Sequence, residues 1–352
     1  MHKLQQSVYI VLLLILVFGG LYIGSSFLIP LALAGVFSML FIKLCNFFER
    51  RGMNRGLAAF LCIFVFIAAV AIIAGLLYWQ MGSLTENLDA MKSRLTGMVE
   101  QLRSWINQKV GIDKKQQKEI IEQGNGQTGA MLAGFAMNVM SIAVNTVLVL
   151  VYMYLSLYYR AHIKQFILKL VPNHEENKAA GIVHESGLVA QKYLSGLGAM
   201  IGVLWVMYGI GFSLVGVESA IFFAVLCGIL EIVPFVGNLT GTSVTVLAVI
   251  AQGGDSKMII GVLLVYGVVQ LVQTYILEPL IVGEQVNINP LFTIMAIVLG
   301  EFIWGVAGMI LAIPILGIIK IICDRVEVLK PYGFLIGPAK APVRRKSLFN
   351  RK

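Results

Sequence analysis

Between Lys3 and Lys43 the chain reads LQQSVYIVLLLILVFGGLYIGSSFLIPLALAGVFSMLFI (4–42), which is 39 residues without a charged side chain. About 20 apolar residues in a helix cross the hydrocarbon core of a membrane, so this stretch predicts a helical hairpin of two crossings. A secretory signal has an apolar region of only about 7–15 residues. Because the uncharged stretch continues past Pro30 to Ile42, we expect it to be retained.

Further uncharged windows of similar length follow along the chain. They cover residues 56–85, 123–159, 193–217, 232–254 and 258–277, and Glu301 alone interrupts a last window at 285–319. Hydrophobic residues make up 58% of the chain and charged residues 13%, which excludes a soluble domain with a hydrated, charged surface. Only helices and closed barrels satisfy their backbone in hydrocarbon, and the alternating pattern of a barrel is absent. The sequence therefore predicts an all-α polytopic membrane protein of about eight transmembrane helices.

The net charge of +9 is concentrated beside these windows. Residues 320–352 carry nine Lys and Arg against two acidic residues, and residues 43–55 carry four basic residues against Glu49. Basic clusters beside spans stay on the cytoplasmic side and favour anionic lipid headgroups. We therefore expect a bacterial inner-membrane protein with both termini in the cytoplasm, an even number of crossings, the lipid bilayer as its partner and no nucleic-acid partner.

The segment between the third and fourth expected spans carries a seven-residue apolar repeat. Its members are spaced alternately four and three residues apart: Leu84, Leu88, Met91, Leu95, Met98, Leu102 and Trp105. This spacing is typical of a helix that packs against other helices. The stripe could pack within its own chain, lie on the membrane surface or contact a neighbouring subunit, and the last of these predicts a homo-oligomer.

These features divide the chain into six expected segments. They are three transmembrane helices in 1–79, an extracytoplasmic amphipathic helical segment at 80–130, a fourth transmembrane helix at 131–159, a cytoplasmic helical segment at 160–196, a transmembrane region with proline-broken helices at 197–320 and a basic cytoplasmic tail at 321–352. Within the cytoplasmic segment, Asn173 and Glu176 resemble a capping box and predict a helix start.

The C-terminal half is acidic although it is the most apolar half. From Glu218 to Glu301 there is one basic residue, Lys257, against six acidic residues, which gives a net charge of −5. An ionisable side chain within a span is costly unless it faces a cavity or a partner. Each acidic residue inside these windows is therefore a candidate functional group.

Glu231 is the sharpest case, because it lies in an apolar run three residues before Pro234. The proline should free the carbonyl of Leu230 from helical hydrogen bonding, and Gly237 and Asn238 favour an unwound turn. A carboxylate beside freed carbonyls is the arrangement with which a broken transporter helix binds a cation or a proton. Glu231 could instead lie at the membrane interface and cap a helix.

A second polar set follows in the next window. Gln270 and Gln273 lie one helical turn apart, and Glu278 precedes Pro279, so the helix should end or kink there. These side chains could line a polar path, or they could form structural hydrogen bonds between helices. Glu301, in a glycine-rich stretch, predicts a break or a re-entrant tip.

The sequence lacks the short motifs that indicate an enzyme. It has no Gly-x-x-x-x-Gly-Lys-Ser/Thr, no His-Glu-x-x-His and no Gly-x-Ser-x-Gly, so we expect neither catalysis nor ATP hydrolysis. Cys45, Cys62, Cys227 and Cys323 lie in or beside apolar windows without the spacing of metal ligands. We expect buried free thiols, no metal site and no cofactor.

The stretches GILEIVPFVGN at 228–238 and ILEPLIVG at 276–283, followed by NPL at 289–291 and GVAGMILAIP at 305–314, resemble hallmarks of the autoinducer-2 exporter family of permeases. The resemblance covers most of the chain and implies an eight-span secondary transporter that forms a homo-oligomer such as a pentamer. Members are linked to export of signalling molecules and to sodium–proton antiport. Glu301 stands where many relatives have Gly, so the substrates of other members do not carry over.

We therefore expect secondary transport of a small molecule or ion, with H⁺ or Na⁺ bound at Glu231 and Glu278 as a second candidate carboxylate. The alternatives are a channel, or a non-transporting scaffold or regulator built on the external helix. An even number of crossings leaves two arrangements: either 219–252 is one broken span, or 219–252 and 290–319 are both hairpins. No motif specifies the solute.

The basic clusters generate a test of orientation. A cysteine introduced at Gln116 should react with an impermeant thiol reagent added outside the cell, and one introduced at Lys346 only after the reagent reaches the cytoplasm. Labelling of both positions from the same side would contradict the predicted topology.

The apolar stripe generates a test of assembly. Burying an apolar side chain contributes about 1.5–3 kcal/mol, so replacing Leu95 and Leu102 by Glu should weaken association, measured as oligomer mass in mild detergent. An unchanged mass and thermal stability would mean that the stripe lies on the membrane surface.

Overall fold

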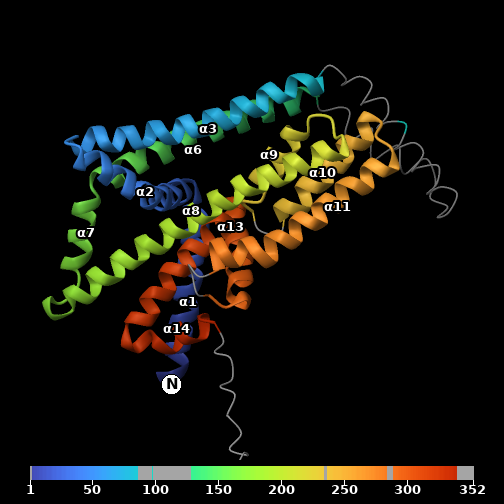
Figure 1. Cartoon of the computed structure of the whole chain (residues 1–352). Helices are drawn as coiled ribbons and strands as arrows, with labels where there is room; N and C mark the ends of the chain where they lie inside the picture. The colour runs from blue at the N-terminus through green and yellow to red at the C-terminus, as the bar shows by residue number, and fades with distance from the viewer. Residues whose placement is uncertain (1, 86–96, 98–127, 234–235, 284–287, 339–352) are drawn as a thin grey trace, which may run out of the picture.

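The computed structural model describes residues 2–85, 97, 128–233, 236–283 and 288–338, and every regular element in these ranges is a helix (Figure 1). Six of these helices are long and apolar enough to cross a membrane, and a seventh crossing results if the bent pair α6 and α7 is one span. The prediction of an all-α, multi-pass membrane protein is confirmed. Of the apolar stripe, Leu84 lies in α3 and the other members lie outside the described residues, so its role stays a prediction.

The first two helices are joined by a single residue. α1 (His2–Ile23) passes into α2 (Ser25–Arg50) at Gly24, and the N–H groups of Gly24 and Leu28 bond to the carbonyls of Gly20 and Gly24, both at 2.9 Å. An antiparallel helix pair needs a loop of about 2–5 residues. The predicted hairpin between the first two spans is therefore wrong: the chain bends at Gly24, and α2 packs mainly against α6.

α3 (Arg55–Thr85) and α6 (Thr128–Tyr158) run side by side and pack against α2 (Figure 1). Small side chains allow this close approach, because Cys45 of α2 and Ala58, Ala59 and Cys62 of α3 are buried against Met153 of α6. The four cysteines of the chain are buried and free, as predicted.

An ion pair fixes the bend after α6. α7 (Arg160–Lys169) turns away by 68°, and its first residue, Arg160, donates hydrogen bonds to Glu49 Oε2 at 2.6 Å, Asn46 Oδ1 at 2.8 Å and Cys45 Sγ at 3.0 Å. Bonds between ionised groups are about twice as strong as neutral ones. The end of α2 therefore holds the α6–α7 bend in place.

α8 (Glu176–Val215) is the central helix of the described fold and contacts α2, α9, α11 and α13. Its 40 residues extend about 60 Å at 1.5 Å per residue. The 3₁₀ turn η1 (Asn173–Glu175) precedes it, so the predicted helix start is confirmed. The capping box is not formed, because the N-cap residue is Glu175 and its side chain makes no capping hydrogen bond.

α9 (Ala220–Leu230) and α10 (Val236–Gln252) form a hairpin against α8. A Cβ atom at Gly241 would lie 3.0 Å from Cys227 Sγ, and one at Gly237 would overlap the Leu230 carbonyl. Both glycines are needed for this close approach. α11 (Ser256–Val272) then leads into the π-helix η2 (Gln273–Gly283).

α13 (Pro290–Arg325) also folds back on itself. Its helical dihedral angles break at Trp304 and at Gly305, where φ is 58°, a value that favours glycine. Ile297 packs against Met309 and Ala312 across the break. The predicted break near Glu301 is confirmed, and both candidate regions are hairpins. The short helices η3 (Glu327–Leu329) and α14 (Lys330–Ile336) follow.

The tip of α13 generates a test of stability. A Cβ atom at Gly308 would overlap the backbone of Gly300, so Gly308→Ala should lower the free energy of unfolding by about 1–3 kcal/mol and lower the melting temperature in detergent. Gly267→Ala in α11 is the matched control, because a Cβ atom there meets nothing within 4 Å. Equal melting temperatures for the two variants would contradict the close contact.

Candidate functional site

Buried polar side chains gather where α8, the α9–α10 hairpin and η2 meet. Glu231, Asn238, Thr242, Thr245 and Gln273 are all less than 10% exposed. Apolar residues of the same helices form a core cluster around the same junction. Polar groups enclosed in this way are retained only where they bond to one another or to a ligand.

Glu231 and Gln273 form the shortest contact of this group. Glu231 is the C-cap residue of α9 and Gln273 is the first residue of η2. The amide Nε2 of Gln273 donates a hydrogen bond to Glu231 Oε1 at 2.6 Å. Each ion pair within the described residues involves other acidic residues. Glu231 therefore relies on an amide, without a basic partner in the described part of the chain.

A relay of hydrogen bonds runs beside this pair and joins four elements. Tyr208 of α8 donates to Asn238 Oδ1 at 3.0 Å, and Asn238 Nδ2 donates to Gln270 Oε1 of α11. Gln270 Nε2 in turn donates to Thr274 Oγ1 of η2 at 3.1 Å. Asn238 also interacts with Glu231, so the relay and the carboxylate–amide pair form one network. It extends from the buried Tyr208 to the exposed Thr274.

Gln270 lies in the last turn of the α-helix α11, and Gln273 begins the irregular π-helix η2. The α-helix ends at Val272, and the wider π-helix η2 carries the chain through Glu278 and Pro279. A π-helical turn is rare and is frequent at functional sites. The α-helix ends earlier than predicted, and η2 continues past Pro279. The change of helix type at Gln273 places that side chain against Glu231.

Two oxygen atoms of the site have unused hydrogen-bonding capacity. Within the described residues, Gln273 Oε1 and Thr242 Oγ1 are buried without a hydrogen-bond partner. Gln273 Oε1 belongs to the amide that bonds to Glu231. A proton donor or a cation at this position would satisfy that oxygen, because an amide carbonyl accepts hydrogen bonds and binds hard cations.

The other sequence-predicted residues occupy different positions. Glu278 is exposed on η2 and interacts electrostatically with Glu231 and Gln273. Glu301 is exposed on α13, and no hydrogen bond or ion pair joins it to Glu231 in the described part of the chain. Pro234 lies outside the described residues. Gly237 is a packing position rather than a ligand.

One predicted ligand is not available in this arrangement. The Leu230 carbonyl, which Pro234 should free, accepts a hydrogen bond from the Val233 N–H at 2.9 Å. That prediction is wrong because the chain turns tightly after Glu231, and the Val233 N–H bonds to the carbonyl in place of the N–H that Pro234 lacks.

Sequence reasoning missed Tyr208 and Thr274. Tyr208 lies four residues from Leu204 and from Phe212, and all three are buried, so its spacing is that of a core aromatic residue. Thr274 carries no signal beyond its place next to Gln273. A polar partner for Asn238 could have been sought among tyrosines of the neighbouring spans.

The depth of Glu231 follows from the length of α9. Eleven residues extend about 16 Å, which is about half of the roughly 30 Å hydrocarbon core. The turn before α9 contains the exposed residue Glu218. An α9 helix that started at the membrane surface and ran along the membrane normal would bring Glu231 to about the middle of the hydrocarbon core.

Comparison with known proteins gives a match over nearly the whole chain. Residues 11–327 match the sequence profile of the AI-2E family transporters. "Putative transport protein YhhT" of Escherichia coli strain K12 is 23% identical over 337 residues, which are 94% of each chain.

Two further relatives carry the same kind of name. The Mycobacterium tuberculosis protein MT0215 is 25% identical over 300 residues, 81% of this chain and 79% of its own. The Bacillus subtilis protein YueF is 22% identical over 312 residues, 84% and 83% of the two chains. All three are named as transport proteins, and none as an enzyme.

Proposed function

Since the chain belongs to the AI-2E family of transporters, we propose that it moves a small solute or ion across the membrane in exchange for, or together with, H⁺ or Na⁺ bound at Glu231. Membership confirms the resemblance carried by the motifs at 228–238 and 276–314. The observation that carries the coupling proposal is the buried Glu231 carboxylate, bonded to Gln273 without a basic partner among the described residues.

A buried carboxylate of this kind has a specific chemical use. Its negative charge is costly away from water, and a bound proton or sodium ion removes that cost. Gln273 suits both states, because an amide donates a hydrogen bond through its nitrogen and accepts one through its oxygen. Rotation of the Gln273 amide would turn Oε1 toward a protonated carboxyl group or toward a cation beside Glu231.

The surrounding helices connect this binding event to a larger movement. Val233, in the turn that follows Glu231, packs against Ile297, Met309 and Ala312 of the α13 hairpin. A ligand shifts a conformational equilibrium when it binds one state more tightly than the other. Neutralisation of Glu231 would change the contacts of the α9–α10 turn, and through Val233 the position of α13, as alternating access requires.

The proposal includes an orientation and an assembly. The basic segments 43–55 and 320–352 support a cytoplasmic location for the corresponding ends of the helices, and bacterial relatives of this kind support the inner membrane. The heptad stripe supports a homo-oligomer, with a pentamer as the form that the family resemblance implies. Transport coupled to an ion needs no resident cofactor.

The proposal predicts the behaviour of a single substitution. Glu231→Gln keeps the shape of the side chain and the bond to Gln273 but cannot titrate. In proteoliposomes loaded with a pH-sensitive dye, the wild-type protein should change the internal pH when a sodium gradient is imposed. We expect Glu231→Gln to lose at least about 90% of that rate, since it cannot exchange a proton.

Glu218→Gln is the matched control, because Glu218 is exposed in the turn before α9. It should retain the wild-type rate. A Glu231→Gln variant that folds and keeps the full sodium-dependent rate would make Glu231 structural. A wild-type protein whose solute flux ignores both gradients would favour the channel alternative.

A further inference from the structure

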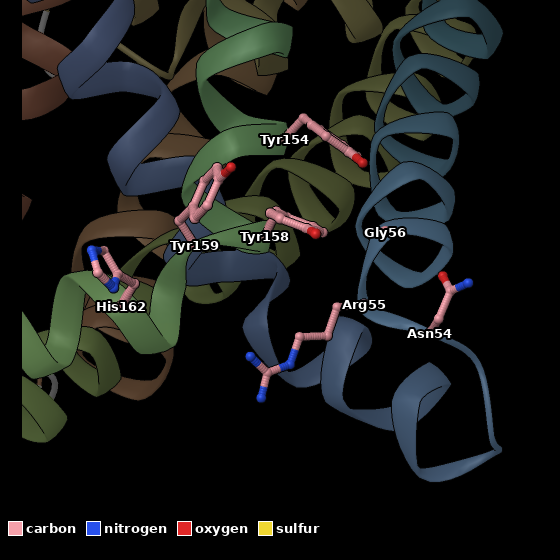
Figure 2. A pocket seen from close by; sticks show the side chains of 7 residues that line it. All are labelled: Asn54, Arg55, Gly56, Tyr154, Tyr158, Tyr159 and His162. Carbon is pink, nitrogen blue, oxygen red and sulfur yellow. The ribbon is translucent and has the colours of Figure 1, made fainter.

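A second polar cavity lies far along the chain from Glu231. A pocket of about 570 Å³ opens where the first turn of α3 faces the end of α6 and the start of α7. Figure 2 shows Tyr154 and Tyr158 extending from α6 toward α3, with Arg55 and His162 at the open side. None of these residues belongs to the network around Glu231.

The pocket has a positive lining. Arg55 and His162 line it, and no Asp or Glu is among its lining residues. Arg55 forms no ion pair within the described residues. The neighbouring Arg160 is bound to Glu49, and Arg51 stacks over the Phe47 ring at 4.4 Å. Arg55 is therefore the guanidinium group that remains available to a ligand here.

Hydroxyl and amide groups complete a set of hydrogen-bond donors. Tyr154 and Tyr158 stack with ring centroids 6.0 Å apart, and Tyr158 meets Tyr159 edge to face at 4.9 Å. Asn54 accepts the Leu57 N–H at 2.8 Å through Oδ1, which leaves its amide nitrogen free to donate. Guanidinium, phenol, amide and imidazole donors together suit an anion with several oxygens, such as a phosphate.

The surface next to the pocket is apolar. On α3, Leu57, Phe60 and Phe64 are exposed, and on α6, Val151 and Leu155 are exposed. These helices run side by side away from the pocket (Figure 1). A ligand with a phosphate in the pocket could therefore lay hydrocarbon chains along α3 and α6. A free phosphate compound would leave that apolar surface unused.

We propose that this pocket binds the phosphate group of an anionic phospholipid, with Arg55 as the principal charged contact and its acyl chains against α3 and α6. The bound lipid would bridge α3, α6 and α7. Tyrosine is common at membrane interfaces without any specific ligand, so the test must separate a specific site from an aromatic belt.

The test uses the purified full-length protein in detergent. Binding of short-chain phosphatidylglycerol is measured by native mass spectrometry and by the rise in melting temperature. Phosphatidylcholine of the same chain length and inorganic phosphate are the comparison ligands. Phosphatidylglycerol should bind and stabilise the wild-type protein. Phosphatidylcholine should do so about tenfold more weakly, because the choline cation beside its phosphate is repelled by Arg55, and inorganic phosphate should also bind more weakly, because it lacks acyl chains to bury against α3 and α6.

Two variants locate the site. Arg55→Gln should weaken phosphatidylglycerol binding about tenfold, whereas the control Arg51→Gln, on the same loop but outside the pocket, should leave it unchanged. Tyr154→Phe removes one hydroxyl from the pocket and should also weaken binding. If Arg55→Gln does not fold, the binding of phosphatidylglycerol to Tyr154→Phe tests the site instead.

Three results would overturn the proposal. Equal losses in Arg55→Gln and Arg51→Gln would indicate attraction to a general basic surface. Unchanged lipid binding in Tyr154→Phe and Arg55→Gln would place the lipid elsewhere. Inorganic phosphate that reproduces the full stabilisation would identify a site for a free phosphate compound instead of a lipid.

Discussion

Within hydrocarbon, each backbone N–H and C=O must find its partner inside the protein, and the described structure depends on this constraint. Long helices meet it along most of the chain. The exceptions are the turn after Glu231, the break at Trp304 and Gly305, and the π-helix η2. Val233 packs against α13 and Gln273 bonds to Glu231, so the irregular segments are close to one another.

The same constraint explains why the chemistry is concentrated in one place. A turn or a π-helix inside a membrane provides side chains with a polar environment that a straight apolar helix cannot. Glu231 and Gln273 lie at these irregular segments and bond to each other, and Asn238, near the start of α10, bonds to Tyr208 and Gln270. The glycines at 237 and 241 bring α10 close enough to α9 for this to happen. The same few contacts, around Glu231 and Gln273, would then determine how far the α9–α10 turn can move and how tightly an ion binds.

Charge is distributed differently at the two ends of the fold. The buried Glu231 carboxylate bonds to an amide, whereas at the α6–α7 bend Arg160 and Glu49 neutralise each other and Arg55 lines the pocket without an ion pair among the described residues. α2 connects these regions, because it packs against α6 on one side and α8 on the other. A lipid bound between α3 and α6 would stabilise the helices that pack against α2. Through α2 it would affect the position of α8, which carries Tyr208 of the Glu231 network.

The fold class, the burial of the thiols and of Glu231, and the break near Glu301 could be predicted from the sequence, because charge spacing, prolines and glycines act on neighbouring residues. The sequence did not determine that the chain bends at Gly24, that both C-terminal regions are hairpins, or that Gln273 is the partner of Glu231, 42 residues away. Tyr208 has the sequence spacing of a core residue, yet it bonds to Asn238 of the site. Glu301 interrupts an apolar run as a site residue would, yet no hydrogen bond or ion pair joins it to Glu231 among the described residues. These pairings depend on how closely helices that are distant in the chain approach one another and on how each is rotated about its own axis. The packing of the helices determines both.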